Sequence, residues 1–319
     1  MRYFDVFNGD ADGICALHQL RLADPVDSQL FTGIKRDIEL LGSVPAGAGD
    51  VVTVLDISLD RNRAGLMALL ERGAHVRYFD HHYAGPLPSH PELEAVIDET
   101  GALCTSALID RHLRGRFRPW AVVGAFGDNL ETAAVELARA LELDEDRLAT
   151  LRELGASLNY NAYGSNVGDV LVPPLELYRI VSHYQDPFEM AEREPAVERL
   201  ASERKADLLR ALASRPVRES EGADAYMLPD APWSRRVNGT FANRLARSAP
   251  ERAHAVLTPV PGGGFSVNVR APRGEGLSAS EFCRRYPTGG GRTLAAGIDH
   301  LDPSRLERFL DEFAEAWRA

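Results

Sequence analysis

Residues 3–13, YFDVFNGDADG, join a short hydrophobic run to a turn that carries Asp10 and Asp12. The run at 3–7 is rich in aromatic and β-branched residues, which favours a strand, and the glycines after it favour a turn. A helix-like segment at 14–22 comes next. Strand, turn and helix in this order are typical of a fold in which parallel strands alternate with helices.

The same alternation continues to about residue 140. Further strand-like runs lie at 51–55, 76–79 and 121–126, and helix-like segments lie at 62–72 and 105–113. Because crossovers between parallel strands place helices on both faces of the sheet, the pattern predicts an N-terminal α/β domain with a mostly parallel sheet.

A second domain is expected in the rest of the 319 residues. The stretch 189–213 is charged and helix-prone, and strand-like runs at 253–258 and 265–270 precede a helical pattern at 304–317. We therefore predict a smaller C-terminal α/β domain. The expected boundaries are 1–188 for the N-terminal domain, 189–222 for a helical linker and 223–319 for the C-terminal domain.

Charge and composition exclude several classes of protein. The net charge of −11 disfavours binding to long duplex nucleic acid, because cationic contacts to phosphates dominate that affinity. Hydrophobic runs are too short to span a membrane, and residues 1–10 do not resemble a secretory signal, so we expect a cytoplasmic protein without a membrane partner. Since Cys15, Cys104 and Cys283 lie far apart, any metal site is expected to use Asp, Glu and His.

Acidic side chains follow each strand-like run of the N-terminal domain. These side chains, with the two histidines beside them, are Asp10, Asp12, Asp56, Asp80, His81, His82 and Asp128. The carboxyl ends of parallel strands meet at one edge of a sheet, so the acids should converge there. An Asp after a strand also commonly caps a helix, and a histidine pair also occurs on surfaces. The hypothesis of a metal site therefore rests on their joint occurrence.

The ligand types indicate the metal and the reaction. Carboxylates with imidazoles and without thiolates favour Mn²⁺, with Mg²⁺ as the second choice. Several neighbouring acids favour two ions, and two cations about 4 Å apart can drive in-line displacement at phosphorus. The sequence thus predicts hydrolysis of a phosphoester.

Four motifs resemble those of the DHH phosphoesterase superfamily, in the same order. They are DADG at 10–13, VLD ending at Asp56, the triplet 80–82, and the later Asp128. Near the C-terminus, TGGGR at 288–292 and AAG at 295–297 are similar to the glycine-rich signature of the DHH-associated substrate-binding domain. The resemblance covers nearly the whole chain.

The resemblance implies a role for each matching residue. Asp10 would bind one cation, Asp56 would bridge both, and Asp12, His81 and Asp128 would hold the second. The catalytic residues would be Asp56, His82 at the phosphoryl group and Asp80, which would orient a neighbouring imidazole. A hydroxide between the metals would be the nucleophile. Many members have a histidine two or four residues before the first Asp, whereas this chain has Asn8 and Val6.

Substrate-binding residues are also expected in the C-terminal domain. Glycine allows backbone N–H groups to approach an anion closely, so the loop Gly289, Gly290 and Gly291 would bind phosphate together with Arg292. Arg292 stands where the family usually has histidine. By resemblance, Arg270 and Asn243 would join them. Arg235 and Arg236 are expected to be solvated surface charges.

The resulting hypothesis is a Mn²⁺-dependent phosphoesterase for short oligonucleotides or small nucleotides. Within the superfamily the chain looks most like the enzymes that degrade very short RNA, the nanoRNases, and dephosphorylate 3′,5′-bisphosphonucleotides. The alternatives are a RecJ-like single-strand exonuclease, a pyrophosphatase or polyphosphatase, and a non-catalytic nucleotide-binding protein with a decayed site. A homodimer is left open.

Overall fold

A computed structural model describes residues 1–274 and 276–318. The chain divides into two compact units, Met1–Ser202 and Glu203–Ala319. The division falls within helix α9, Pro195–Leu212. The stretch 189–222 holds most of α8, all of α9 and a strand that belongs to the second sheet. The exact domain boundaries drawn from the sequence stay a prediction.

The first unit is built on a sheet of five parallel strands in the order β2-β1-β3-β4-β5. This confirms the mostly parallel sheet that the sequence predicts. The strands are Tyr3–Asn8 (β1), Ser28–Gly33 (β2), Val51–Leu55 (β3), His75–Asp80 (β4) and Leu93–Ile97 (β5).

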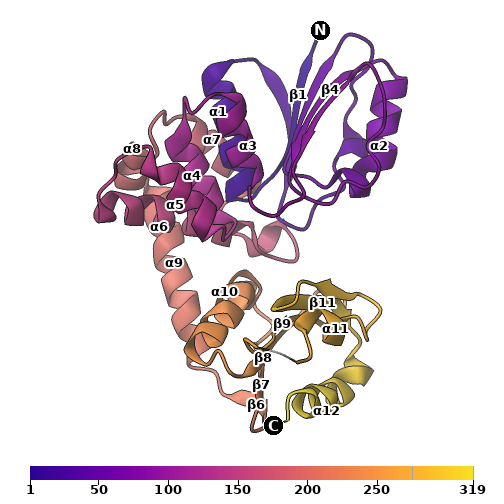
Figure 1. Cartoon of the computed structure of the whole chain (residues 1–319), viewed down its shortest axis with the longest axis vertical. Helices are drawn as coiled ribbons and strands as arrows, with labels where there is room; N and C mark the ends of the chain where they lie inside the picture. Colours follow the sequence, from indigo (N-terminus) through magenta and orange to yellow (C-terminus); the bar gives the residue numbers. More distant parts are fainter. Residues whose placement is uncertain (275, 319) are drawn as a thin grey trace. The chain divides into compact units, whose positions relative to one another are not determined.

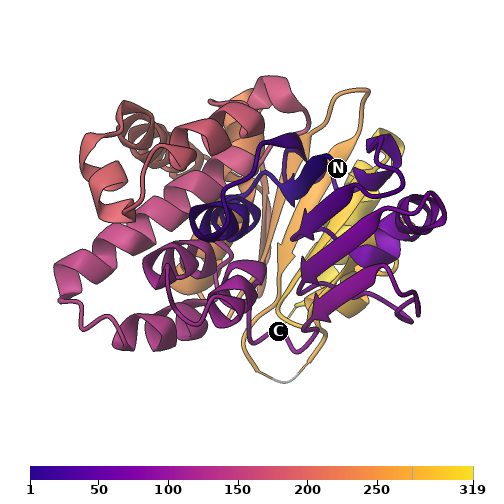
Figure 2. The ribbon, with the colours of Figure 1, turned by 90° about the horizontal axis from the view of Figure 1, so that it is seen from above.

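Helices cover both faces of this sheet, as expected (Figures 1 and 2). Successive side chains of a strand point to opposite faces, so β1 contributes to two hydrophobic cores. Phe4 and Val6 belong to the core beneath α2, Leu59–Glu71, and the single-turn helix η1, Leu41–Ser43. Phe7 belongs to the core on the other face, which α1, Ala11–Ala23, and α3, Thr105–His112, help to form.

A group of further helices packs beyond α1. They are α4 (Arg118–Gly127), α5 (Glu131–Arg139), α6 (Glu145–Ala162), η2 (Val167–Asp169), α7 (Pro174–Ser182) and α8 (Pro187–Arg193).

The expectation of a strand at 121–126 is wrong, because these residues lie within α4. A short run of apolar residues is compatible with a buried strand and with a buried helix, so the pattern alone cannot distinguish them. Here the run is buried on every side, since α4 packs against both α1 and α6. Pro119 in the first turn of α4 is a position where proline favours a helix.

The second unit is smaller and contains a six-stranded sheet in the order β10-β11-β9-β8-β7-β6. Among the described strand pairs of this second sheet, only β7 and β8 are parallel. The strands are Pro216–Glu219 (β6), Ala223–Met227 (β7), Ala253–Pro259 (β8), Phe265–Arg270 (β9), Gly289–Gly291 (β10) and Ala295–Leu301 (β11).

Helices also cover both faces of the second sheet, which confirms the predicted C-terminal α/β domain. Helix α10, Pro232–Ser248, places Phe241 in one core. The opposite core holds Phe282 of α11, Ala279–Cys283. It also holds Phe309 of α12, Leu306–Ala316, a helix that follows the short helix η3, Pro303–Arg305.

All three cysteines are buried and free of disulfides in the described chain. Burial raises the pKa of the Cys15 and Cys104 thiols well above the usual value, and the negative charge of Asp12 adds to the effect. Burial also raises the pKa of Cys283, to about 12. These thiols therefore stay protonated and unreactive in the folded chain. Within residues 1–274 and 276–318, no helix is long and apolar enough to cross a membrane.

Candidate metal centre

Asp56 stands at the carboxyl end of β3 in an uncommon backbone conformation. Its φ angle is +60°, in the left-handed region that Asp and Asn tolerate better than most residues. Its N–H donates to the carbonyl of Phe79 at 3.0 Å, which holds this turn against β4. The side chain is buried, and Oδ1 accepts a hydrogen bond from Thr105 Oγ1 at 3.1 Å. The carboxylate is thus fixed beside the end of β4.

His81 and His82 follow β4 and lie next to Asp56. Nε2 of His81 is 3.4 Å from Asp56 Oδ1 and 3.7 Å from Asp128 Oδ2. Asp56, His81 and His82 each offer a ligand atom, and these atoms lie within 4.8 Å of one another. It is the one such group of three among the described residues. Its carboxylate and imidazole donors suit Mn²⁺.

Asp80 positions His82. The Nδ1 atom of His82 lies 2.7 Å from Oδ1 of Asp80, whose side chain is fully buried. Oδ2 of Asp80 has no hydrogen-bond partner among the described residues. Burial lowers the pKa of His82, but the hydrogen bond and the charge of Asp80 outweigh it and raise the pKa above its usual value. The imidazole is 45% exposed, so it can meet a ligand from solvent.

Asp10 and Asp12 lie beside this group, and both cap helices. Oδ1 of Asp10 accepts the N–H groups of Asp12 and Gly13 at 3.0 and 3.1 Å, at the start of α1. The two oxygens of Asp12 accept the N–H groups of Thr105 and Ser106 at 2.7 and 2.8 Å, at the start of α3. The capping alternative therefore holds for both acids, and several of their lone pairs are already engaged.

Negative charge gathers at this edge of the sheet. Burial raises the pKa of Asp56 well above its usual value, and the charges of Asp10, Asp12 and Asp128 raise it further. Burial also raises the pKa of Asp128, which caps the C-terminal end of α4. A bound cation would relieve this repulsion.

Two residues of the site were not anticipated from the sequence. Thr105, the first residue of α3, binds Asp56 as described above. Lys35 follows β2, and its ammonium bonds to a carboxylate oxygen of Asp10 and lies 3.4 Å from Oδ1 of Asp128. Burial lowers the pKa of Lys35, but these carboxylates raise it well above its usual value. The sequence does contain a signal for Lys35. Among its 36 basic residues only Lys35 and Lys205 are lysines, and all the others are arginines.

The glycines at 289–291 form strand β10 rather than the loop that the sequence suggested. A Cβ on Gly289 would lie 1.8 Å from the carbonyl oxygen of Cys283. Gly291 has φ +138°, and a Cβ there would lie 2.5 Å from Cα of Ala296. Close packing thus requires both, whereas a Cβ on Gly290 would meet no described atom within 4 Å.

The sequence predicts roles for four arginines of the second unit, two as substrate contacts and two as surface charges. Arg292 is exposed, and Nε of Arg270 donates to Oδ1 of Asn243 at 2.8 Å, so Arg270 and Asn243 do lie together. The expectation that Arg235 and Arg236 are solvated is wrong. Their side chains are 10% and 8% exposed, and they pair with Asp230 and Asp207.

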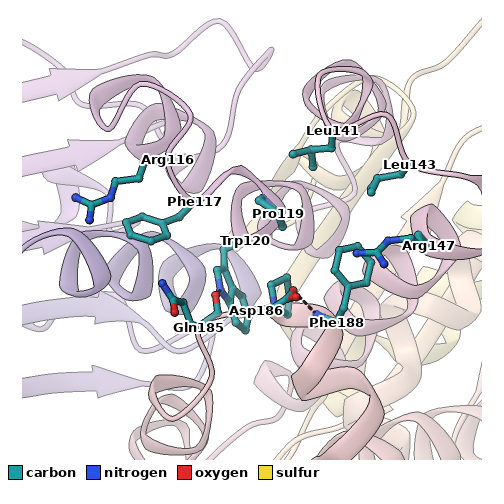
Figure 3. A pocket seen from close by; sticks show the side chains of 11 residues that line it. Arg116, Phe117, Pro119, Trp120, Leu141, Leu143, Arg147, Gln185, Asp186 and Phe188 are labelled. Atoms are coloured by element: carbon teal, nitrogen blue, oxygen red, sulfur yellow. Dashed lines mark hydrogen bonds between the residues drawn. The ribbon is translucent and has the colours of Figure 1, made fainter.

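A pocket of about 360 Å³ lies elsewhere in the first unit, at the N-terminal end of α4 (Figure 3). Its lining is largely aromatic and apolar, with the guanidinium of Arg116 over Phe117 and that of Arg147 only 3.8 Å from the ring centre of Phe188. No predicted site residue lines it in the part of the chain that the structure describes. Asp128 caps the opposite end of α4.

Comparisons with known proteins give matches only in structure. No protein-family model matches the chain, and no curated protein matches it. A manganese-bound RecJ exonuclease is similar over 99% of this chain and 90% of its own, with 17% identity and a TM-score of 0.61. The pGpG-specific phosphodiesterase PggH of Vibrio cholerae is similar over 99% of this chain and all of its own, with 12% identity and a TM-score of 0.53.

RecJ of Thermus thermophilus, solved with Mn²⁺, is similar over 98% of this chain, with 18% identity and a TM-score of 0.66. The present chain spans about half (51%) of that protein. The chain therefore shares the fold of these RecJ and phosphodiesterase structures, which agrees with the fold that the motif resemblance implied.

Proposed function

We propose that the chain is a divalent-metal-dependent phosphoesterase that hydrolyses small nucleotides or short oligonucleotides. The observation that carries the proposal is the group Asp56, His81 and His82, whose ligand atoms lie within 4.8 Å of one another at the carboxyl edge of a parallel sheet. This edge is where open α/β sheets bind ligands.

The residues present fit a manganese or magnesium ion. The donors are the carboxylate of Asp56 and the imidazole of His81, with Asp128 Oδ2 3.7 Å from His81 Nε2, and the buried Oδ2 of Asp80 has no partner in the described chain. Asp56 and His81 would hold the ion, with Asp128, Asp10 and Asp12 as the further ligands that the family resemblance implies. A bound divalent cation supplies Lewis-acid polarisation of the phosphoryl group and lowers the pKa of water.

The chain's own residues have distinct tasks in this proposal. Asp80 holds the Nδ1 side of His82, which leaves Nε2 for a phosphoryl oxygen or for the leaving oxygen. The imidazole of His82, held by Asp80, is placed to donate a proton as negative charge develops on the leaving group. Thr105 fixes the rotamer of Asp56 through its hydroxyl.

Substrate contacts are proposed for the second unit. The exposed Arg292 and the half-buried Arg270, with the backbone of the strand Gly289–Gly291, would bind a phosphate remote from the scissile bond. Arginine favours such contacts because its planar guanidinium can donate two parallel hydrogen bonds to a phosphate. The net charge of −11 favours a short ligand over a long polyanion.

The test is a substrate panel assayed with the full-length chain and Mn²⁺. The panel holds dinucleotides such as pGpG, a 3′,5′-bisphosphonucleotide, a single-stranded DNA oligomer and pyrophosphate. We expect hydrolysis of a dinucleotide or bisphosphonucleotide that EDTA abolishes and Mn²⁺ restores, and near-complete loss in His82→Ala.

Other outcomes contradict this proposal in separate ways. Preferred cleavage of the DNA oligomer would favour the exonuclease alternative, and preferred cleavage of pyrophosphate would favour a pyrophosphatase. Binding of a nucleotide without turnover under any metal would favour the non-catalytic alternative. Activity that survives excess chelator would contradict the metal centre itself.

A further inference from the structure

The ammonium of Lys35 lies against two carboxylates of the candidate metal centre. It contacts carboxylate oxygens of Asp10 and Asp128, two of the predicted metal ligands. The backbone is held on both sides, since its N–H donates to the carbonyl of Ala162 at 3.0 Å and its carbonyl accepts from Asn8 Nδ2 at 3.4 Å. The ammonium also lies 5.8 Å from the centre of the Tyr163 ring. Lys35 is therefore a fixed part of the site.

The remaining ligand atoms suffice for a single ion. One oxygen of Asp10 accepts two N–H groups of α1 and the other binds Lys35. Both oxygens of Asp12 accept N–H groups of α3. Among the described residues, Asp56, His81 and His82 form the one group of three whose ligand atoms converge.

We propose that the Lys35 ammonium takes the place of one of the two expected cations, so that the centre binds one divalent ion beside a built-in positive charge. This inference rests on the proposed function and changes its metal count. The ammonium would neutralise Asp10 and Asp128 permanently and leave the single ion at Asp56 and His81.

The choice of lysine supports this role. Of the 36 basic residues, Lys35 and Lys205 alone are lysines, so lysine at this position stands out against a strong preference for arginine. An ammonium is a compact point charge with three donors, and in size and charge it resembles a metal ion more than a planar guanidinium does.

The experiment counts bound metal in the full-length chain. Apo protein is titrated with MnCl₂ and followed by calorimetry and by the free Mn²⁺ signal in electron paramagnetic resonance. We expect one ion per wild-type chain and two per chain in Lys35→Gln, whose amide can still donate to Asp10. Lys35→Met makes the same test without a hydrogen-bond donor, and we again expect two ions per chain. Lys205→Met, at an exposed site on α9, is the matched control and should bind one ion per chain, as the wild type does.

Each other result has a definite meaning. Two ions in the wild type would overturn the inference and leave the proposed function intact. One ion in both the wild type and Lys35→Gln would also overturn it, because Lys35 would then not occupy a cation's place. No bound ion in a folded wild type would overturn the metal-dependent function as well. Two ions in the wild type would overturn the inference even if the variants do not fold.

Discussion

Asp56 combines a charged side chain with a left-handed backbone, and these two properties can be separated by mutation. Asn tolerates φ near +60° as well as Asp does, so Asp56→Asn should keep the turn and remove only the charge. We predict that metal affinity falls and that kcat drops at least about 10³-fold, or roughly 4 kcal/mol of transition-state stabilisation.

The measurement is steady-state kinetics with Mn²⁺ on the preferred substrate, together with metal content. Asp60→Asn, an exposed acid on α2, is the control and should behave as the wild type. A near-normal rate in Asp56→Asn with normal metal content would contradict the role of Asp56.

His18 should make the stability of the chain depend on pH. Burial lowers the pKa of His18 to about 4, although the hydrogen bond between Nε2 and the carbonyl of Tyr184 at 2.7 Å acts in the opposite direction. The unfolded chain binds this proton at about pH 6.5, whereas the folded chain does not bind it until about pH 4. The stabilising contribution is complete above pH 6.5 and is lost as the pH falls towards 4.

We predict that this residue alone removes about 3 kcal/mol of unfolding free energy over that range, at 1.36 kcal/mol per pKa unit. His18→Gln, which cannot be protonated, should flatten the profile by this amount. Urea unfolding of metal-free protein, followed by tryptophan fluorescence from pH 7 to 4, measures the difference. Parallel profiles for the wild type and the variant would contradict the prediction.

Two glycines of strand β10 differ in their surroundings, so their substitution distinguishes a packing role from a role in substrate contact. Gly291→Ala would combine an unfavourable φ with a clash against Ala296, so we predict a loss of about 1–3 kcal/mol in unfolding free energy. Gly290→Ala should change stability by less than about 0.5 kcal/mol, because the added methyl would meet only open space.

The same two variants test the proposed phosphate contact. Urea unfolding gives the stability, and KM on the preferred nucleotide gives the binding. A raised KM in a fully stable Gly290→Ala would support close approach of a ligand to this strand. An unstable Gly290→Ala would show that the packing assigned to this position is wrong.

The helices and strands that could be predicted from the sequence are those in which the local pattern of apolar and polar residues agrees with the packing around them. The strand expected at 265–270 has those bounds in the structure, and the helices around 14–22 and 105–113 differ by a few residues at their ends. The run 121–126 was misassigned because contacts with α1 and α6, far away in sequence, decide its conformation. The local sequence at 289–291 indicates a loop, because it carries no information on the carbonyl of Cys283 and the backbone of Ala296, whose close packing requires these glycines.

The site shows the same limit. The acids at strand ends could be predicted, because the topology of a parallel sheet brings strand ends together. Lys35 and Thr105 could not be placed there by spacing, since each reaches the centre from an element that carries no motif. The fact that Asp10 and Asp12 also cap helices depends on where α3 packs, which the local sequence does not specify.

In the proposed function, the first unit carries out the hydrolysis and the second unit binds the remote part of the substrate. If Arg292 binds a remote phosphate, its contact exists before and during the reaction, so it contributes uniform binding. Arg292→Ala should then raise KM on the preferred nucleotide about tenfold or more, with a smaller effect on kcat and no loss of bound metal. Arg305→Ala, another exposed arginine of the second unit, is the control.

A p-nitrophenyl phosphodiester, which lacks the remote phosphate, makes this division testable. Arg292→Ala should hydrolyse it at the wild-type rate. Equal damage on the small ester and on the nucleotide would mean that Arg292 acts in the reaction centre or in folding, and the assigned division would be wrong.

The buried thiols give each unit its own chemical marker of opening in the intact chain. Cys15 and Cys104 lie in the first unit and Cys283 in the second, and a thiol reagent can modify them only after their own core has loosened. Pulsed alkylation at rising urea, read by peptide mass spectrometry, therefore reports the order in which the units open. Because a ligand protects the unit that binds it, the same labelling pattern recorded with Mn²⁺ and then with a nucleotide would locate each ligand without an assay of turnover.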